Sequence, residues 1–404
     1  MHNIVVLGAN FAGIPVTHYL LRHVLPPLNS MGVGTYKVTL VSPSTRFFFK
    51  VGAPRALTSA EAVPLDHSFL SIPEAFKDYN PSHFTFIQGE AVGIDEVGKR
   101  VIVTQPMDGL TTDLEYESLI IATGTTSKSA LWTLHGDYTI TRDAFKDLHA
   151  RLPKAQRIAI VGGGPSGVET AGEIAYRFKD RDITLLSGTT RLLSNLKNTG
   201  VSATAEKKLK ALNVSIVHGL KVLSSKENAS GKTILALSDG NTEEFDLVID
   251  ATGGQPNSSF LPIAWLDERL RVGTDTTTLR VLEAPAGVYG IGDVASYSRG
   301  NILDVRDAVA PLCYSVWFDS YQLAVAARKK DGKETGMTMP QVLKESKLKL
   351  IESDMQVVPI GPEGGVGVLF GWRVPSWVVW LHKSRTMFFE KAPGLVAGAD
   401  YVKP

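Results

Sequence analysis

The 404-residue sequence predicts an α/β fold in which one structural unit occurs twice. The runs VVLGANFAG, starting at residue 5, and IVGGGPSGVE, starting at residue 160, each place a glycine-rich turn between an apolar strand and a helix. Later in each half, the runs YESLIIATGT and FDLVIDATGG share the tripeptide ATG after a strand. These repeats predict two Rossmann-like dinucleotide-binding domains, the second inserted in the first, and a small C-terminal α+β domain.

The charge and the cysteine content exclude several classes of protein. Lys and Arg number 42 and Asp and Glu number 41, so the net charge is +1 and no basic field is present to attract nucleic acid. Cys313 is the only cysteine, which excludes an intrachain disulfide, a C-x-x-C redox pair and a cysteine-built zinc site. The histidines have no metal-ligand spacing, so no metal site is predicted.

The start of the chain carries no targeting signal. The opening MHNIVVLG enters an apolar run at once and leaves no room for a signal peptide. Its second residue, His2, is not the glycine that N-myristoylation requires. No run approaches the roughly 18 apolar residues of a membrane-spanning helix. We therefore expect a cytoplasmic protein that is soluble or, at most, peripheral on a membrane or lipid surface.

The first half is predicted to open as a βαβ unit. A strand over 4–7 leads through the glycine turn into a helix from Phe11 to about Leu25. A loop over 26–34 and a strand over 36–42 follow. Short alternating runs between 83 and 122 predict a small antiparallel insertion that returns to the parallel sheet.

The second half repeats this order. Helical spacing begins at Thr141, a candidate N-cap, and a strand from Arg157 enters the second glycine turn. Later expected elements are a strand over 182–187, a short strand ending at Gly292 and Asp293, a helix over 304–330 and a polar linker over 329–336. The predicted domains are residues 1–128 with 256–330, residues 129–255, and a C-terminal domain over 337–404.

The glycines of such a turn have separate roles in binding a dinucleotide. The first permits the sharp change of direction, the second lets the backbone approach the pyrophosphate, and the third lets helix and strand pack closely. The first turn has Asn10 in place of the middle glycine, and the residues concerned are Gly8, Asn10 and Gly13, then Gly162, Gly164 and Gly167. An asparagine amide can donate to a phosphate oxygen, so we interpret the first turn as a modified site, the alternative being a turn that binds nothing.

The strand after each glycine turn ends in serine, at Ser42 and Ser187, where an acidic residue would hold an unphosphorylated ribose. Ser187 is followed by GTTR, in which two hydroxyls and Arg191 could cradle a 2′-phosphate. The alternative is a solvated loop in which Arg191 only covers the adenine. A modest preference for NADPH over NADH is therefore predicted.

The ordered motifs resemble the two-dinucleotide flavoprotein reductases, and among them the apoptosis-inducing-factor-like branch with ferroptosis-suppressor-type quinone reductases and their fungal relatives. The resemblance covers nearly the whole chain. The motifs that carry it are GANFAG, SPSTRFFFKVGAPRAL, LIIATG, GGGPSGVETAGEI, ATGGQPN, GIGDVAS and VPSWVVWLHKSRTMFF.

This resemblance implies FAD on the first domain and NAD(P)H on the second, over the flavin ring. Gly8 and Gly13 would lie at the FAD pyrophosphate and Asp293 at the ribitol or phosphate, although an aspartate there could also be a helix cap. The implied cofactor-binding residues are Gly8, Asn10, Phe11, Ala12, Gly13, Ser42, Arg46, Lys50, Val92, Ala122, Thr123, Gly124, Gly162, Gly164, Pro165, Ser166, Gly167, Glu169, Ser187, Arg191, Gly253, Gly292 and Asp293.

Two ion pairs are expected around the second helix. In the resembling enzymes, a glutamate at the place of Glu169 faces the junction of nicotinamide and flavin and pairs with a lysine, for which Lys50 is the candidate here. These two are the implied catalytic residues. A carboxylate in a first helical turn is also favourable for the helix dipole alone. Glu173 and Arg177 are expected to form an ordinary i,i+4 surface pair.

The segment over 371–389 concentrates aromatic and basic side chains, namely Trp372, Trp377, Trp380, Phe388, Phe389, Arg373, His382, Lys383 and Arg385. We expect it to be buried against the flavin domain or against a second subunit of a homodimer. The alternative is a segment that lies on a membrane surface or lines a quinone entrance. His382 is expected at the surface.

The leading hypothesis is that NAD(P)H delivers hydride to flavin N5 and that the flavin passes electrons to a quinone-like small acceptor. Disulfide reductases of this fold relay electrons through a cysteine pair, but the matching run, FFFKVGAPRAL over 47–57, has no sulfur. Cys313 lies in an apolar run and is predicted to be buried and inert. The alternatives are a biosynthetic flavoenzyme acting on a dedicated metabolite and a nucleotide-sensing interaction protein of the death-effector type.

Overall fold

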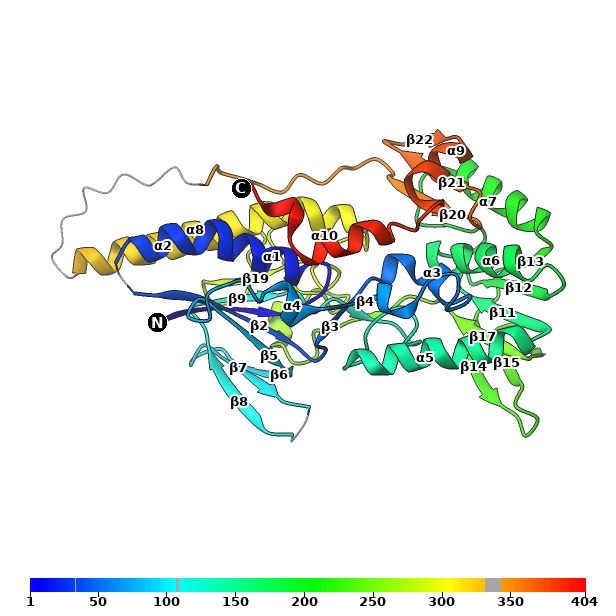
Figure 1. Cartoon of the computed structure of the whole chain (residues 1–404), viewed down its shortest axis with the longest axis horizontal. Helices are drawn as coiled ribbons and strands as arrows, with labels where there is room; N and C mark the ends of the chain where they lie inside the picture. Colours follow the sequence, from blue (N-terminus) through cyan, green and yellow to red (C-terminus); the bar gives the residue numbers. More distant parts are fainter. Residues whose placement is uncertain (33, 107–108, 331–342) are drawn as a thin grey trace.

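The computed structural model describes residues 1–32, 34–106, 109–330 and 343–404, and it has two parallel sheets flanked by helices (Figure 1). The first sheet has the strand order β19-β9-β1-β2-β5. Its strands are β1 (His2–Leu7), β2 (Tyr36–Ser42), β5 (Phe84–Gln88), β9 (Ser118–Ile121) and β19 (Val288–Gly290). β1 is central and buried, which is why its sequence is a continuous apolar run.

The antiparallel insertion is shorter than predicted. β5 pairs in parallel with β2, from Val38 opposite Phe84 to Ser42 opposite Gln88, and so forms the edge of the main sheet. Only β6 (Glu90–Asp95), β7 (Arg100–Thr104) and β8 (Thr111–Glu115) are antiparallel. A partly exposed edge strand alternates in sequence much as an antiparallel strand does, so the sequence pattern did not separate the two.

The second parallel sheet has the order β13-β12-β11-β17 and carries a three-stranded antiparallel sheet beside it. The parallel strands are β11 (Arg157–Val161), β12 (Asp182–Ser187), β13 (Val214–His218) and β17 (Leu247–Asp250), and the antiparallel ones are β14 (Val222–Glu227), β15 (Thr233–Leu237) and β16 (Thr242–Phe245). The chain leaves the first sheet through β10 (Thr125–Thr126) and returns through β18 (Gln255–Pro256), which pair antiparallel. The predicted domain boundaries remain a prediction, and residues 331–342 of the linker region lie outside the described residues.

Two helix ends differ from the prediction. α1 (Gly13–Tyr19) continues through a π-helical segment over 20–24 into α2 (Leu25–Ser30), so the helix passes Pro26 and Pro27 instead of ending near Leu25. The prolines fit because they lie in the first turn of α2, where a proline's missing N–H matters least. α5 (Tyr138–Arg151) is capped by Asp137, whose Oδ1 accepts a 3.1 Å hydrogen bond from the Thr139 N–H, and Thr141 lies inside the helix.

The other helices include the long α8, which confirms the helix predicted over 304–330. They are α3 (Ala53–Ala56), α4 (Ile72–Ala75), α6 (Pro165–Arg177), α7 (Thr199–Ala211) and α8 (Ile302–Lys330). β3 (Arg46–Phe48) and β4 (Phe69–Ser71) pair antiparallel, and α3 lies in the chain segment that joins them. No helix among the described residues is long and apolar enough to cross a membrane.

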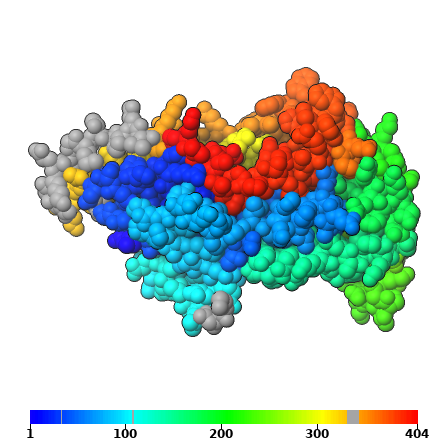
Figure 2. All heavy atoms as spheres, viewed as in Figure 1, coloured from blue at the N-terminus to red at the C-terminus, as the bar shows by residue number. Residues whose placement is uncertain are grey.

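The C-terminal region contacts both sheet layers. It contains β20 (Gln356–Pro359), β21 (Gly365–Leu369), β22 (Trp372–Val374), α9 (Ser376–Val379), a π-helical segment (Trp380–Ser384) and α10 (Ala392–Val396). The strands pack on α6 and α7, whereas α10 lies on α1 (Figure 1). In the space-filling view these residues form one continuous strip along the molecule (Figure 2).

The aromatic residues of this region are not packed as expected. Trp372, Trp377 and Trp380 are exposed, so the expected burial against the flavin domain is wrong for them. Phe388 and Phe389 are half-buried, and His382 is at the surface as predicted. The tryptophans face outward because the apolar contacts of the small C-terminal sheet are made by Val358, Val366, Val368 and Val379.

Candidate functional site

The residues that follow the parallel strands gather at one edge of each sheet. At the first sheet these are Gly8, Ser42, Ala122, Thr123, Gly124, Gly292 and Asp293, and at the second they are Gly162, Ser187 and Gly253. The carboxyl ends of parallel strands meet at the same edge, which is where open α/β sheets bind ligands. The structure therefore brings together most of the residues that the sequence singled out.

The first and third glycines of the two turns are required by the chain itself. Gly8 and Gly162 have φ values of +102° and +124°, which side chains rarely adopt. A Cβ at Gly13 would overlap the carbonyl oxygen of Gly8, and a Cβ at Gly167 would overlap that of Gly162. Each turn thus folds its helix tightly against the preceding strand.

The middle positions have no such internal requirement. A Cβ at Gly164 would meet no protein atom within 4 Å, and the residue has an extended backbone that any side chain tolerates. In the first turn, Asn10 Oδ1 is buried without a hydrogen-bond partner in the described structure. The open cradle at the start of α6 fits a pyrophosphate that faces a helix N-terminus. At the start of α1, the unpaired Asn10 Oδ1 needs a hydrogen-bond donor, which a phosphate does not offer, whereas Nδ2 of the same amide can donate to a phosphate oxygen.

Asp293 and Lys50 form an ion pair next to the first turn. Lys50 Nζ lies 3.0 Å from Asp293 Oδ2, and the Ser298 hydroxyl donates to Asp293 Oδ1 over 3.4 Å. Burial would raise the pKa of Asp293, but the Lys50 charge and these hydrogen bonds outweigh it and lower that pKa. Asp293 is therefore a half-buried carboxylate, paired with Lys50, at the carboxyl edge of the first sheet.

Glu169 is buried on α6 and pairs with the C-terminal region. Lys383 Nζ lies 2.6 Å from Glu169 Oε1, and both side chains are largely shielded from solvent. Desolvation raises the pKa of Glu169, although the Lys383 charge and hydrogen bond partly offset this effect. The expected pair between Glu169 and Lys50 is wrong, because Lys50 is taken by Asp293 and the lysine comes from the other end of the chain.

Comparisons with known proteins agree with this geometry. The family model described as pyridine nucleotide-disulphide oxidoreductase matches residues 2–330. The chain belongs to this family. Among the relatives, Oxidoreductase phnG of Penicillium herquei is 33% identical over 99% of this chain and 97% of its own length. Ferroptosis suppressor protein 1 of Xenopus tropicalis is 26% identical over 96% of this chain and 94% of its own length.

The fold also matches solved structures of the family type. NDH2 from Plasmodium falciparum, in complex with NADH, has a TM-score of 0.65 and 17% identity and covers 100% of this chain and 99% of its own. Family membership confirms the predicted fold class and the predicted cofactor types, FAD and NAD(P)H. This pyridine nucleotide-disulphide oxidoreductase is therefore an NAD(P)H-dependent flavin oxidoreductase.

A second buried ion pair corrects another expectation for this oxidoreductase. Glu173 is buried and accepts hydrogen bonds of 2.9 and 2.7 Å from the guanidinium of Arg55 on α3. Arg177 pairs instead with Glu61, at 3.1 Å. The i,i+4 surface pair is wrong because Glu173 faces α3, from which an arginine reaches it, rather than solvent.

In the loop after β12, the Arg191 side chain forms hydrogen bonds with residues that follow it in the chain. Arg191 donates to the carbonyl oxygens of Ser194 and Leu196 and to the Ser202 hydroxyl. Ser187 is buried, and its hydroxyl lies 3.1 Å from that of Thr189. The preference for NADPH stays a prediction.

Three further residues that were predicted to bind a cofactor are Phe11, Arg46 and Val92. Phe11 lies 5.0 Å, centroid to centroid, from Phe47, and the Arg46 guanidinium lies over the Tyr138 ring. Val92 lies on β6 with about half of its side chain exposed. None of these positions by itself tests a cofactor contact.

Sequence reasoning did not place three residues in this region: Arg55, and Lys383 and Phe389 of the aromatic and basic segment. A Cβ at Gly52 would overlap the Phe389 ring, which also lies 5.4 Å from the ring of Phe49. Glycine in the run FFFKVGAPRAL was the one local signal that another side chain lies close there.

Proposed function

We propose that this oxidoreductase passes electrons from NAD(P)H through FAD directly to a flat, quinone-like acceptor, without a thiol relay. The observation that carries the proposal is the position of the only thiol. Cys313 is fully buried in α8, and its Sγ lies 4.0 Å from the carbonyl oxygen of Val16. Burial raises the pKa of Cys313 well above its usual value, so the thiol is neither accessible nor ionised near neutral pH.

A thiol relay also needs a resolving sulfur, and the sequence has only one cysteine. The run in which related disulfide reductases carry their cysteine pair contains Phe49, Lys50 and Gly52 here. The Phe389 ring packs on Gly52 and Phe49. An aromatic surface at this place suits a flat, partly apolar acceptor that stacks, rather than a disulfide that exchanges.

The chain's own residues would bind and orient the reactants. When bound, FAD accepts a hydride from NAD(P)H and passes the electrons on to the acceptor. The amide of Asn10 would donate to a phosphate of FAD, and the Asp293 carboxylate would accept from a cofactor hydroxyl. Glu169, held by Lys383, would orient the nicotinamide without donating a proton, which is a positioning role.

An acceptor screen with the purified protein tests the proposal. A yellow protein that oxidises NAD(P)H with short-chain quinones and leaves glutathione disulfide unreduced would support it. Turnover of disulfides at a comparable rate would contradict it. Absorbance at the flavin bands, with mass analysis of the released cofactor, tests FAD separately, and colourless folded protein that FAD does not reconstitute would contradict that part.

The nucleotide preference has its own measurement. NADPH is expected to give the higher kcat/KM, and Arg191→Ala should reduce the NADPH value more than the NADH value. Equal values for the two nucleotides in the unaltered protein would contradict the preference.

A second candidate is an oxidoreductase with a dedicated metabolite as its substrate. The observation that favours it is the greater identity to Oxidoreductase phnG, 33%, than to ferroptosis suppressor protein 1 of Xenopus tropicalis, 26%. The same screen separates the candidates. NAD(P)H that reduces the bound flavin, followed by no turnover with any quinone, would support the dedicated metabolite.

A further inference from the structure

Five large apolar side chains within 12 residues of the C-terminal region are exposed, and we name them the aromatic patch. Their exposed fractions are 62% for Phe370, 81% for Trp372, 65% for Trp377, 40% for Trp380 and 50% for Leu381. They lie in the β21–β22 turn, on β22, on α9 and on the following π-helical segment. Figure 1 shows these elements at an outer edge of the molecule, so a flat surface can approach them.

The backbone presents part of the patch at a conformational cost. Phe370 has a φ of +51°, which is rare for a bulky residue, and Gly371 follows with a φ of +82°. This tight turn joins β21 to β22, in which Leu369 pairs with Trp372, and it leaves the Phe370 side chain exposed. Large apolar surfaces of this kind usually mark a contact with a partner or a membrane.

The charged residues in the segment that forms the patch are all positive. Residues 370–385 include three cations, Arg373, Lys383 and Arg385, and no acidic residue. Arg373 and Arg385 are exposed, and the Arg385 guanidinium lies 5.8 Å from the Trp380 ring centroid. Lys383 points inward to Glu169, so Arg373 and Arg385 are the exposed cations of this segment. Lys208 on α7 also reaches the segment, through a 3.2 Å hydrogen bond to the Ser376 hydroxyl.

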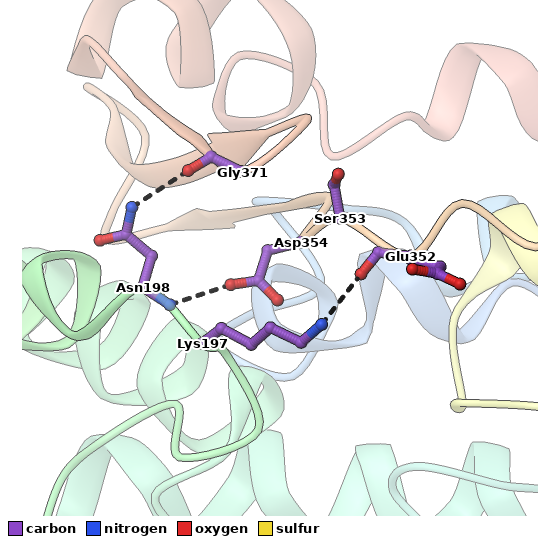
Figure 3. A pocket seen from close by; sticks show the side chains of 6 residues that line it. All are labelled: Lys197, Asn198, Glu352, Ser353, Asp354 and Gly371. Carbon is purple, nitrogen blue, oxygen red and sulfur yellow. Dashed lines mark hydrogen bonds between the residues drawn. The ribbon is translucent and has the colours of Figure 1, made fainter.

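The neighbouring cavity does not provide an apolar pocket for the patch. It measures about 460 Å³ and is lined by Lys197, Asn198, Glu352, Ser353, Asp354 and Gly371 (Figure 3). Its groups bond to one another: the Asn198 N–H donates to Asp354 over 3.0 Å, and Lys197 Nζ donates to the carbonyl oxygen of Glu352 over 3.3 Å. The patch therefore has a polar margin on this side and no cover from its own chain there.

We propose that the aromatic patch docks on the surface of a lipid bilayer that contains anionic lipid. Tryptophan favours the interface between headgroups and acyl chains, because one part of its ring system is apolar and its N–H is polar. Basic side chains beside it gain attraction to anionic headgroups. The inference does not depend on the identity of the electron acceptor.

A second copy of the chain fits the patch less well. In a two-fold symmetric dimer the same patch lies on both sides of the interface. Arg373 and Arg385 of one copy would then face a surface that carries the same two positive charges, and like charges across an interface oppose association. Anionic headgroups neutralise the same two arginines.

Vesicle flotation tests the proposal on the full chain. We expect the protein to float with vesicles of phosphatidylcholine and phosphatidylserine, to shift its tryptophan emission to the blue, and to be released by salt. Trp372→Ser with Trp377→Ser should weaken this binding about tenfold or more, because two exposed rings no longer enter the interface. Ile263→Ser with Leu282→Ser, which removes exposed apolar side chains elsewhere, should leave it unchanged.

Three results would overturn the proposal. One is the absence of binding to anionic vesicles by the unaltered protein, and another is equal binding by the tryptophan variant. The third is a dimer in sedimentation that becomes a monomer in the tryptophan variant, since a second copy would then cover the patch. Circular dichroism of the variant verifies that it is folded.

Discussion

The two glycine-rich turns of this oxidoreductase have the same backbone form and differ at the middle position. In both, the outer glycines allow a positive φ and a close approach of helix to strand that a Cβ would block. Gly164 faces open space, whereas Asn10 buries an amide oxygen without a partner in the described structure. The outer glycines are therefore requirements of folding, and the fold places no such requirement on the middle residue.

The helices after the two turns differ in the side chain that they carry at equivalent positions. Gly8 and Gly162 are 154 positions apart, so Pro15 on the first helix corresponds to Glu169 on the second. The first position is apolar and buried, whereas the second carries a charge that Lys383 satisfies. The second helix thus carries a buried ion pair at a position where the first has an apolar side chain.

Both helices also contact the C-terminal region at matching positions. His18 corresponds to Gly172 by the same spacing. The His18 ring bonds to the carbonyl oxygen of Val396, and a Cβ at Gly172 would lie 2.7 Å from the Cα of Ile360. One contact is a hydrogen bond from the His18 Nε2–H to a carbonyl oxygen, and the other is a close backbone approach.

The strongest test of the shared backbone is an alanine at the third glycine of either turn. Gly13→Ala and Gly167→Ala each place a Cβ on a carbonyl oxygen that no rotamer change can avoid. We expect a loss of order 5 kcal/mol in the free energy of unfolding, measured by urea denaturation. Gly164→Ala is the matched control and should change it by less than about 0.5 kcal/mol. An equal loss of unfolding free energy in all three variants would contradict the claim that the third glycines, and not the middle one, are required for folding.

Removing the partner of Glu169, the buried carboxylate on α6, should give the next largest loss of stability. Lys383→Met leaves Glu169 buried without its partner, which should cost about 3 to 5 kcal/mol at pH 8. The carboxyl's raised pKa lets it take up a proton as the pH falls, so the loss should be smaller at pH 5. Adding Glu169→Gln should recover much of the stability. Lys210→Met, at an exposed position on α7, is the control. A loss that is the same at both pH values would contradict the pairing.

The burial of the His18 ring on the first helix predicts a pH dependence of stability. Burial, together with the charge of Arg22, lowers the pKa of His18 to about 4, although the bond to Val396 opposes this. The unfolded chain binds the proton near pH 6.5, so stability present above that pH is lost as the pH falls toward 4, by up to about 3 kcal/mol. Thermal unfolding at several pH values measures this loss, and His18→Gln should flatten the curve. An unchanged slope in the variant would assign the pH dependence to other groups.

The strand ends and both turns could be predicted from the sequence because their signals are local. A glycine turn between an apolar strand and a helix fixes its own geometry, and parallel strands then align their carboxyl ends. The partners of Glu169 and Lys50 could not be predicted in this way. Lys383 lies 214 residues from Glu169, and its approach depends on how the C-terminal region packs on α6.

Substitutions at the middle positions, Asn10 and Gly164, should have smaller effects, and these should be on cofactor binding and not on stability. Gly164→Ala should raise the KM for NAD(P)H about tenfold, because a methyl group enters the space where the pyrophosphate approaches. Asn10→Gly should weaken FAD binding a few-fold, because an amide donor is lost. Fluorescence titration of the apoprotein with FAD measures the second effect. Tighter FAD binding in Asn10→Gly would show that the asparagine obstructs the first turn.

Direct transfer from flavin to acceptor is the central claim, and replacing the only thiol tests it most directly. Cys313→Ser, with Cys313→Ala as a second variant in case a buried hydroxyl destabilises the core, should leave the steady-state rate of quinone reduction within about twofold. Flavin content and circular dichroism establish that each variant is loaded and folded. Retained turnover in either folded variant is the predicted result, and loss of turnover in both, with flavin and fold intact, would contradict the account.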